Sequence, residues 1–115
     1  MKMHEMSLAQ NILDIVLNTA RQNDVTKVLG ITIRAGELRG IVPEQLEFCF
    51  GFIAQDSIAE GANLKVNTLA VKARCKSCHR AFFVKEFHFI CPACEGTDLE
   101  TLQGLELLVE HIEVL

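Results

Sequence analysis

The first apolar pattern of the chain has the three- and four-residue spacing of an amphipathic helix. One predicted face carries Leu8, Ile12, Ile15, Val16, Thr19 and Ala20, because residues at these spacings lie on the same side of a helix. Ser7 followed by Gln10 has the form of a capping box, which satisfies the first free backbone donors. We therefore predict a helix of about four turns that begins at Ser7 and ends near Asn23 and Asp24.

Three later segments have the composition and pattern of strands. Residues 27–36 alternate between Leu29, Ile31, Ile33, Ala35 and the intervening Gly30, Thr32, Arg34, and β-branched residues at a period of two predict a strand. Residues 64–73 alternate less regularly. Residues 105–115 are rich in Leu, Val and Ile with interleaved Glu, and they follow Gly104. We predict a strand in each of the three segments.

A second helix is predicted from Pro43 to about Gln55. Proline suits the first helical turn, and Glu44 is favourable beside the helix N-terminus. Apolar residues surround much of the circumference, which predicts a well-buried helix. These residues are Leu46, Phe48, Cys49, Phe50, Phe52 and Ile53.

The order of elements defines the fold class. Helix, strand, helix and strand are followed by a cysteine-rich region and a closing strand, which predicts an α+β fold. We expect two helices on a three-stranded sheet, formed by residues 1–73 plus 103–115, with an inserted cysteine hairpin domain at 74–102. The 115 residues, half of them hydrophobic, suffice for one small core and such a module.

Charge and hydropathy exclude several classes of protein. The formal net charge of −4 argues against nucleic-acid binding by composition. No apolar run approaches the roughly 18 residues of a membrane span, and Glu5, Gln10, Asn11 and Asp14 interrupt any secretory segment. We predict a cytoplasmic protein. Thiols stay reduced in the cytoplasm, so paired cysteines there are more often metal ligands or redox groups than disulfides.

Two C-x-x-C pairs carry the clearest chemical signal. Cys75 and Cys78 form one pair, Cys91 and Cys94 the other, with 12 residues between the pairs. This pattern predicts a tetrahedral, four-thiolate zinc site that is structural, since it leaves no open position for water. The spacer is long enough for a hairpin, and Phe82, Phe83, Phe87 and Phe89 are expected to cover it.

Other interpretations of these residues are weaker. Cys75–His79 also matches the C-x-x-C-H pattern of haem attachment, but that leaves the second pair without a purpose. A redox dithiol usually has one pair. His79 is either a solvent-facing knuckle residue or an alternate zinc ligand that makes the site sensitive to pH. Cys49 is expected to be a buried small hydrophobe, and no set of catalytic residues is apparent.

The N-terminus is a candidate for a second metal site. His4 and Glu5 lie just before the predicted helix cap. They are either part of an exposed terminus or part of a site in which an imidazole and backbone nitrogens bind Ni²⁺ or Cu²⁺ in a square plane.

These features together resemble one family, the HypA/HybF nickel metallochaperones of [NiFe]-hydrogenase maturation. The matching segments are MHEMSLAQNILDIV from Met3, IRAGELRGIVPEQLEFCF, AEGANLKV, the paired C-x-x-C module and the last strand. The resemblance covers nearly the whole chain, and the Met-His-Glu start and the Gly-Glu-Leu segment before a Pro-Glu helix are its specific parts.

The resemblance implies a protein that is not an enzyme. It implies a transient Ni²⁺ site at His4, with the backbone nitrogen of Glu5, beside a structural Zn²⁺ site. The implied partners are a HypB-type GTPase and the hydrogenase large subunit, and some relatives also serve urease maturation. A monomer or weak homodimer is expected.

Two positions depart from the family pattern. Met1 and Lys2 precede Met3, so either translation starts at Met3 or a terminal-amine ligand is displaced. Val42 stands where some relatives have an acidic residue, so this chain lacks a carboxylate there.

Two rival functions rest on the cysteine module. Residues 72–98 hold five basic and three acidic residues, so a zinc ribbon that binds nucleic acid or protein is one alternative, with phenylalanines that could stack on bases. A thiol-based redox zinc switch is the other. Neither rival explains the Met-His-Glu start.

Overall fold

The computed structural model describes the chain from Met3 to Leu115, with side chains from Glu5 onward. The chain forms two compact units. The first comprises the residues up to Arg34 together with Ile41–Asn67 and Leu108–Leu115, and the second comprises Ala35–Gly40 and Thr68–Leu107. Compactness alone does not say which metal each unit binds, so the division into nickel- and zinc-binding domains stays a prediction.

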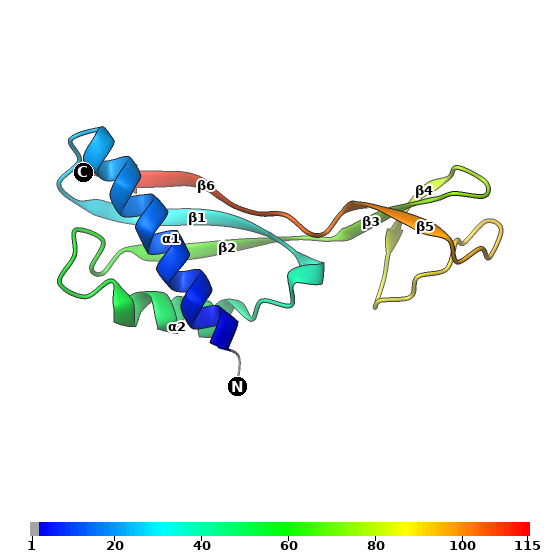
Figure 1. Ribbon diagram of the computed structural model, residues 1–115, viewed down its shortest axis with the longest axis horizontal. Helices are drawn as coiled ribbons and strands as arrows, with labels where there is room; N and C mark the ends of the chain where they lie inside the picture. The colour runs from blue at the N-terminus through cyan, green and yellow to red at the C-terminus, as the bar shows by residue number, and fades with distance from the viewer. Residues whose placement is uncertain (1–2) are drawn as a thin grey trace. The chain divides into compact units, whose positions relative to one another are not determined.

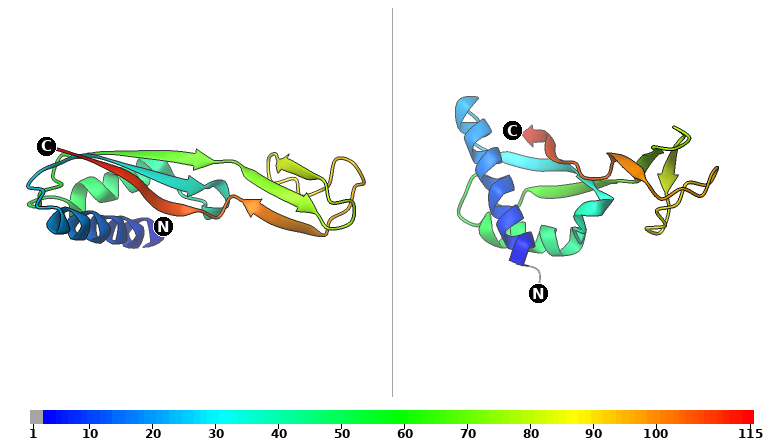
Figure 2. Two further views of the ribbon diagram at one scale, coloured as in Figure 1. Left: turned by 90° about the horizontal axis from the view of Figure 1, so that it is seen from above. Right: turned by 45° about the vertical axis from the view of Figure 1, so that its right-hand side comes forward.

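The first unit consists of two helices and a three-stranded sheet. Helix α1 spans Met3–Gln22 and helix α2 spans Pro43–Ile53. The strands β1 (Val28–Gly36), β2 (Asn63–Leu69) and β6 (Leu107–Val114) form a sheet in the order β2-β1-β6. The two helices pack against each other, and α1 crosses the strands obliquely on one side of the sheet (Figures 1 and 2). The predicted α+β fold is confirmed.

The core of the first unit joins the helices to the central strand. Helix α1 buries Ala9, Ile12, Leu13, Val16 and Ala20, helix α2 buries Leu46, Cys49 and Phe50, and β1 buries Val28, Ile31 and Ile33. Strand β1 lies between two neighbours, so nearly all its residues are covered, apart from Leu29, which is 47% exposed.

The predicted start of the first helix is wrong. The helix begins at Met3 rather than at Ser7, so Ser7 lies inside it and does not act as an N-cap. His4 and Glu5 therefore belong to the first helical turn instead of preceding it. Glu5 suits this place because its charge is favourable near the positive end of the helix dipole. Ile15 was predicted to lie on the buried face of this helix, but it is half exposed. Leu13, which was not predicted to be buried, is buried instead.

The predicted burial of the second helix is also wrong. Only one side of α2 is covered, and Phe48 and Phe52 are 76% and 60% exposed. The apolar residues around the circumference therefore do not reflect burial on all sides. Cys49 is a buried small residue, as predicted.

The strand predicted at 64–73 is two strands in different sheets. Strand β2 ends at Leu69, and β3 (Val71–Cys75) follows after Ala70. In the second unit, β3 lies between β4 (Ala81–Val84) and β5 (Leu99–Gln103). Both pairings are antiparallel, with Ala73 opposite Phe82 in one and opposite Thr101 in the other.

A small apolar cluster supports the second unit. Val71, Ala73 and Val84 are buried, with Leu38, Phe82 and Leu99 packed against them. The predicted cover of four phenylalanines is therefore wrong in part. Phe82 packs on the cluster, whereas Phe83, Phe87 and Phe89 are exposed. Lys72 Nζ lies 5.5 Å from the centre of the Phe83 ring, a distance at which a cation–π attraction acts.

A close approach of two glycines holds Ala35–Gly40 to the rest of the second unit. A Cβ added to Gly36 would lie 2.0 Å from the backbone of Gly104. Gly36 donates to the Glu106 carbonyl at 2.7 Å, and Leu38 donates to the Gly104 carbonyl at 2.9 Å. The sequence signal for this contact is only a pair of glycines.

We expect Gly36→Ala to destabilise the protein by about 1–3 kcal/mol, because backbone atoms would have to move apart. Gly51→Ala is the control. A Cβ at Gly51 meets no described atom within 4 Å, and alanine in a helix is about 1 kcal/mol better than glycine. Chemical unfolding should therefore show changes of opposite sign, and equal stability of the two variants would contradict the close contact.

Within residues 3–115, none of the helices is both long enough and apolar enough to cross a membrane.

Candidate metal centre

The second unit brings four cysteine sulfurs together. The Sγ atoms of Cys75, Cys78, Cys91 and Cys94 all lie within 4.8 Å of one another. Cys75 Sγ is 3.5 Å from Cys94 Sγ, and Cys78 Sγ is 3.6 Å from Cys91 Sγ. Cys75 and Cys91 are buried, whereas Cys78 and Cys94 are exposed. This arrangement can hold a metal ion, with one side of the site facing solvent.

The two C-x-x-C pairs are held by the same backbone pattern. The amides of His79 and Glu95 donate to the Cys75 and Cys91 carbonyls at 2.8 and 2.9 Å, respectively. The amides of Cys75 and Cys91 donate to the Arg80 and Gly96 carbonyls, both at 2.9 Å. The two turns therefore have nearly the same backbone structure, and each directs its two sulfurs toward a common point.

The residue after each pair adopts a left-handed backbone conformation. His79 has φ of 67° and Glu95 has φ of 63°, values that are uncommon for residues other than glycine. This conformation reverses the chain after the second cysteine of each pair. His79 is exposed and is not among the described side chains that converge at the site. Its possible role as an alternate ligand stays a prediction.

Strand pairing brings the second turn to the first. Cys75 ends β3 and lies opposite Leu99 of β5, and the Lys76 amide donates to the Asp98 carbonyl at 3.0 Å. Strand β5 follows the second cysteine pair directly, so its pairing with β3 fixes both turns beside each other. The sequence analysis did not identify β5, because Leu99–Gln103 has little apolar alternation.

Gly96 is a site residue that the sequence analysis missed. A Cβ there would lie 3.3 Å from Cys94 Sγ and 3.5 Å from Cys75 Sγ. A side chain would therefore crowd the sulfurs on one side. Arg80 occupies the equivalent position in the first turn. The similarity of the two C-x-x-C turns therefore does not indicate that position 96 needs a glycine.

The surroundings shift the pKa values of the thiols in opposite directions. The Cys78 backbone amide is the main cause that lowers the pKa of Cys75 to about 6, against the effect of burial. Hydrogen bonding from the Cys94 amide likewise lowers the pKa of Cys91. For Cys94, the Gly96 amide acts to lower the pKa, but the Cys75 sulfur, burial and the other two sulfurs together raise it to about 12.

These shifts predict how the zinc-loaded protein responds to acid. Because the folded-state pKa of Cys75 lies below its ordinary value of 9.0, its thiolate contributes stability above pH 9, and this contribution is lost only as pH falls through about 6. We expect the parent protein to keep its zinc at pH 7 and to release it only below about pH 6, as measured by a zinc-sensitive dye. Release of zinc already above pH 7 would contradict this prediction.

The N-terminal candidate site is described only in part. The side chain of His4 lies outside the described residues. Glu5 is 1% exposed, so its carboxylate belongs to the interior and not to a ragged terminus. Val42 is the residue before α2, and it is 38% exposed.

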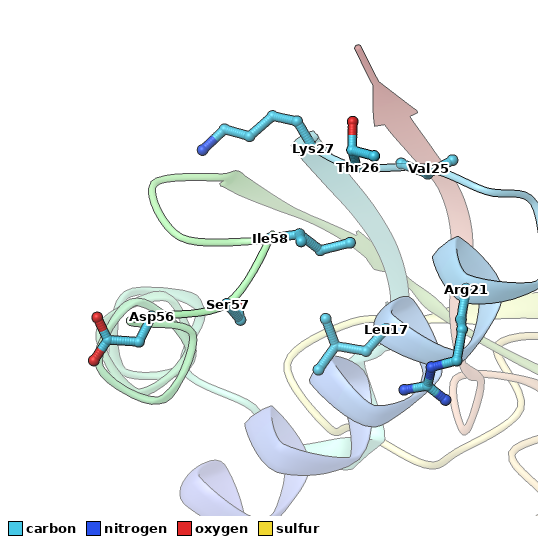
Figure 3. Close-up of a pocket in the computed structure, with 8 residues that line it drawn as sticks. All are labelled: Leu17, Arg21, Val25, Thr26, Lys27, Asp56, Ser57 and Ile58. Carbon is cyan, nitrogen blue, oxygen red and sulfur yellow. The ribbon is translucent and has the colours of Figure 1, made fainter.

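A cavity of about 630 Å³ in the first unit lacks the features of a catalytic site. Leu17, Val25 and Ile58 line it together with polar residues that include Arg21, Lys27 and Asp56. In Figure 3, the charged ends of Lys27 and Asp56 both point away from Leu17 and lie well apart. Lys27 Nζ donates to the Glu60 carbonyl at 3.2 Å. The charged groups therefore do not converge on a common point.

Comparison with known proteins places the chain in a family. Residues 3–114 match the family described as "Hydrogenase/urease nickel incorporation, metallochaperone, hypA". The chain is 38% identical over 112 residues to a protein from Desulfitobacterium hafniense (strain DSM 10664 / DCB-2), named hydrogenase maturation factor HypA. The match covers 97% of this chain and 98% of that protein. The factor of the same name from Albidiferax ferrireducens is also 38% identical, over 97% and 99% of the two chains.

Solved structures share the fold. A solution structure titled as HypA protein superposes with a TM-score of 0.74 at 21% identity, over 100% of this chain and 98% of the other. The nickel metallochaperone HypA from Helicobacter pylori gives a TM-score of 0.69 at 20% identity, over 96% and 97%.

The family match, together with this fold and the four-cysteine cluster, places the chain among the nickel-incorporation metallochaperones. The chain belongs to the HypA family, as the sequence analysis predicted.

Proposed function

We propose that this protein binds Ni²⁺ transiently at its N-terminus and delivers it to the large subunit of a [NiFe]-hydrogenase during maturation. The observation that carries the proposal is the family match, which begins at Met3 and extends to residue 114. It includes both Met3-His4-Glu5 and the four cysteines. The protein is proposed to act by handing over an ion and not by catalysing a reaction.

We propose that Zn²⁺ occupies the four-cysteine cluster and has a structural role. Zn–S bonds of about 2.3 Å in a tetrahedron place the sulfurs about 3.8 Å apart. The distances of 3.5 and 3.6 Å between sulfurs fit this geometry closely. Four thiolates leave no open position for water, and a unit with so small an apolar cluster gains folding free energy from the ion.

We propose His4 as a nickel ligand, with the backbone nitrogen of Glu5 as a second. Square-planar binding through successive amide nitrogens closes five-membered chelate rings that are nearly flat, which requires ψ near 0°. The helical value is about −42°, so loading would locally distort the first turn of α1. The proposed site lies in the first turn of α1, so it can distort without breaking the helix interior. Such a site suits an ion that must be released.

The proposed partners follow from the delivery role. They are a HypB-type GTPase, the hydrogenase large subunit and, for a urease client, urease maturation proteins. We propose that the protein acts in the cytoplasm as a monomer or weak homodimer. The six basic and six acidic residues of the second unit give no charge support to a nucleic-acid partner.

The test of this proposal is the metal content per chain after nickel loading, measured by plasma mass spectrometry. The chain as written is compared with a version that starts at Met3. We expect one zinc in each, and one nickel in at least the Met3 version. If only the Met3 version binds nickel, the terminal amine is a ligand. If neither binds nickel beyond what a metal-exchanged zinc site explains, the delivery function is wrong.

A further inference from the structure

Within the described part of the chain, the outward face of α2 makes no contact that explains its sequence. Residues three and four apart share a helix face, so Glu44, Glu47, Phe48, Gly51 and Phe52 lie together, and all of them are exposed. The opposite face carries the buried Leu46, Cys49 and Phe50. Helix α2 thus has two apolar sides, of which the first unit covers only one. In Figure 1, α2 lies beside the N-terminal half of α1.

The two outward phenylalanines form one apolar patch. Phe48 and Phe52 are one helical turn apart, and they are 76% and 60% exposed. A fully buried aromatic side chain covers roughly 150–250 Å², so the pair offers about 300 Å² to a partner. A patch of this size approaches the largest apolar patch of a typical monomer, which is often functional.

Gly51 is the second, independent feature of this face. A glycine inside a helix costs about 1 kcal/mol relative to alanine. A Cβ at this position would meet no described atom within 4 Å, so packing within the described chain does not require glycine. Its φ is not in the left-handed range. Gly51 adjoins Phe52 and follows Phe48 by three residues, so it leaves bare backbone between the two rings. A partner group can therefore approach the helix closely at that point.

The charge of the surroundings determines the chemistry of the partner. Helix α2 carries Glu44 and Glu47 on the same face and has no basic residue. The whole first unit has five basic and nine acidic residues, so it is negative by four charges. A partner with Lys or Arg beside its apolar contact would be attracted, and an acidic one would be repelled.

We propose that Phe48, Gly51 and Phe52 form a docking site for an apolar segment flanked by Lys or Arg, on another protein of nickel delivery. One apolar side chain of that segment inserts between the two rings, over Gly51, and its basic residues meet Glu44 and Glu47. A second copy of this chain is a poorer occupant. A stable interface buries about 800 Å² per partner, and two faces with the same negative charge repel each other. This proposal depends on the proposed function in one respect, namely that the partner takes part in nickel delivery.

Site-specific photocrosslinking in cells that mature a nickel enzyme tests the proposal. A benzophenone amino acid replaces Phe48 in one protein, and Phe83 of the second unit, which is 56% exposed, in the control. We expect a major adduct from position 48 that is absent from position 83. Mass spectrometry should map it to an apolar segment flanked by Lys or Arg.

A charge reversal provides the matched variant. Glu44→Lys with Glu47→Lys should lower the yield of the position-48 adduct at least about tenfold, because attraction becomes repulsion. The reversal keeps the exposed positions polar, so the fold is expected to persist, and circular dichroism checks this. An adduct with a second copy of this chain would overturn the proposal. So would an adduct shared with position 83, or one that is insensitive to the reversal.

The nickel content separates this proposal from the proposed function. Phe48→Ser with Phe52→Ser should lower hydrogenase maturation while the purified chain still holds as much nickel as the parent. If the parent chain holds no nickel but the mapped adduct forms, the docking site stands and the nickel function fails. If the parent holds nickel and the Phe variants mature hydrogenase normally, the docking site is wrong.

Discussion

Replacing Cys91 with serine is expected to remove the metal from the four-cysteine site and to unfold most of the second unit. Cys91 is fully buried, and its sulfur lies 3.6 Å from that of Cys78. Binding of structural zinc contributes about 10–16 kcal/mol in small zinc modules. The apolar cluster of Val71, Ala73 and Val84 is far too small to replace that contribution. Zinc content per chain should fall from one to near zero.

Amide spectra by NMR should show which part of the chain unfolds. We expect the resonances of β3, β4 and β5 to lose dispersion while those of α1 and β1 keep it, because the two units have separate cores. Cys49→Ala is the control, since Cys49 lies in α2, outside the cluster. A Cys91→Ser protein that still held zinc with a folded β3–β5 sheet would contradict the structural role of the site.

Replacing His4 with alanine is expected to remove the nickel and leave the zinc. An imidazole is the one side chain near the N-terminus that binds Ni²⁺ strongly at neutral pH. Loss of a group that merely supports a metal ligand costs 10–100-fold in affinity, so loss of the ligand itself should cost at least about 100-fold. Isothermal titration with Ni²⁺ measures the change in affinity, and mass spectrometry measures the zinc.

The control for His4 is His111→Ala. His111 is exposed in β6, so its loss removes an imidazole without affecting the N-terminus. Circular dichroism should show that α1 persists in both variants, because its buried residues Ala9, Ile12, Leu13, Val16 and Ala20 are unchanged. Equal nickel affinity in the parent and His4→Ala would show that the nickel ligands lie elsewhere.

Periodicity in the sequence was sufficient to predict the main elements of the first unit. The helical spacing from Leu8 to Ala20 results from one-sided burial of α1. The alternation around Ile31 and Ile33 indicated a strand correctly, although β1 is covered on both faces. The C-x-x-C spacing also predicted that four sulfurs would meet, because a two-residue gap lets both thiolates turn toward one point.

The sequence did not predict which apolar residues would be covered. Phe48 and Phe50 have the same kind of side chain, yet one is 76% exposed and the other 1%. Hydrophobicity alone does not distinguish a residue that packs within the chain from one that is available to a partner. The start of α1 was also missed. Ser7 has the form of an N-cap, but the helix begins four residues earlier, at Met3.

Long-range contacts were also beyond the reach of the sequence patterns. The pairing of β5 with β3, which fixes the two cysteine turns, joins Leu99 to Cys75 across the whole cysteine module. A Cβ at Gly96 would contact two sulfurs from different turns. Each depends on the folded position of residues far apart in the chain, and neither leaves a local pattern in the sequence.

Delivery of nickel is tested most directly by following radioactive Ni²⁺ from the loaded chain to a purified, nickel-free hydrogenase large subunit. The HypB-type GTPase is present, and an excess of chelator captures any ion that enters solution. The account predicts that nickel reaches the large subunit from the loaded chain but not from a nickel salt under the same conditions. If the chelator captures the nickel equally from both sources, the ion passes through solution, and the protein is not a delivery factor.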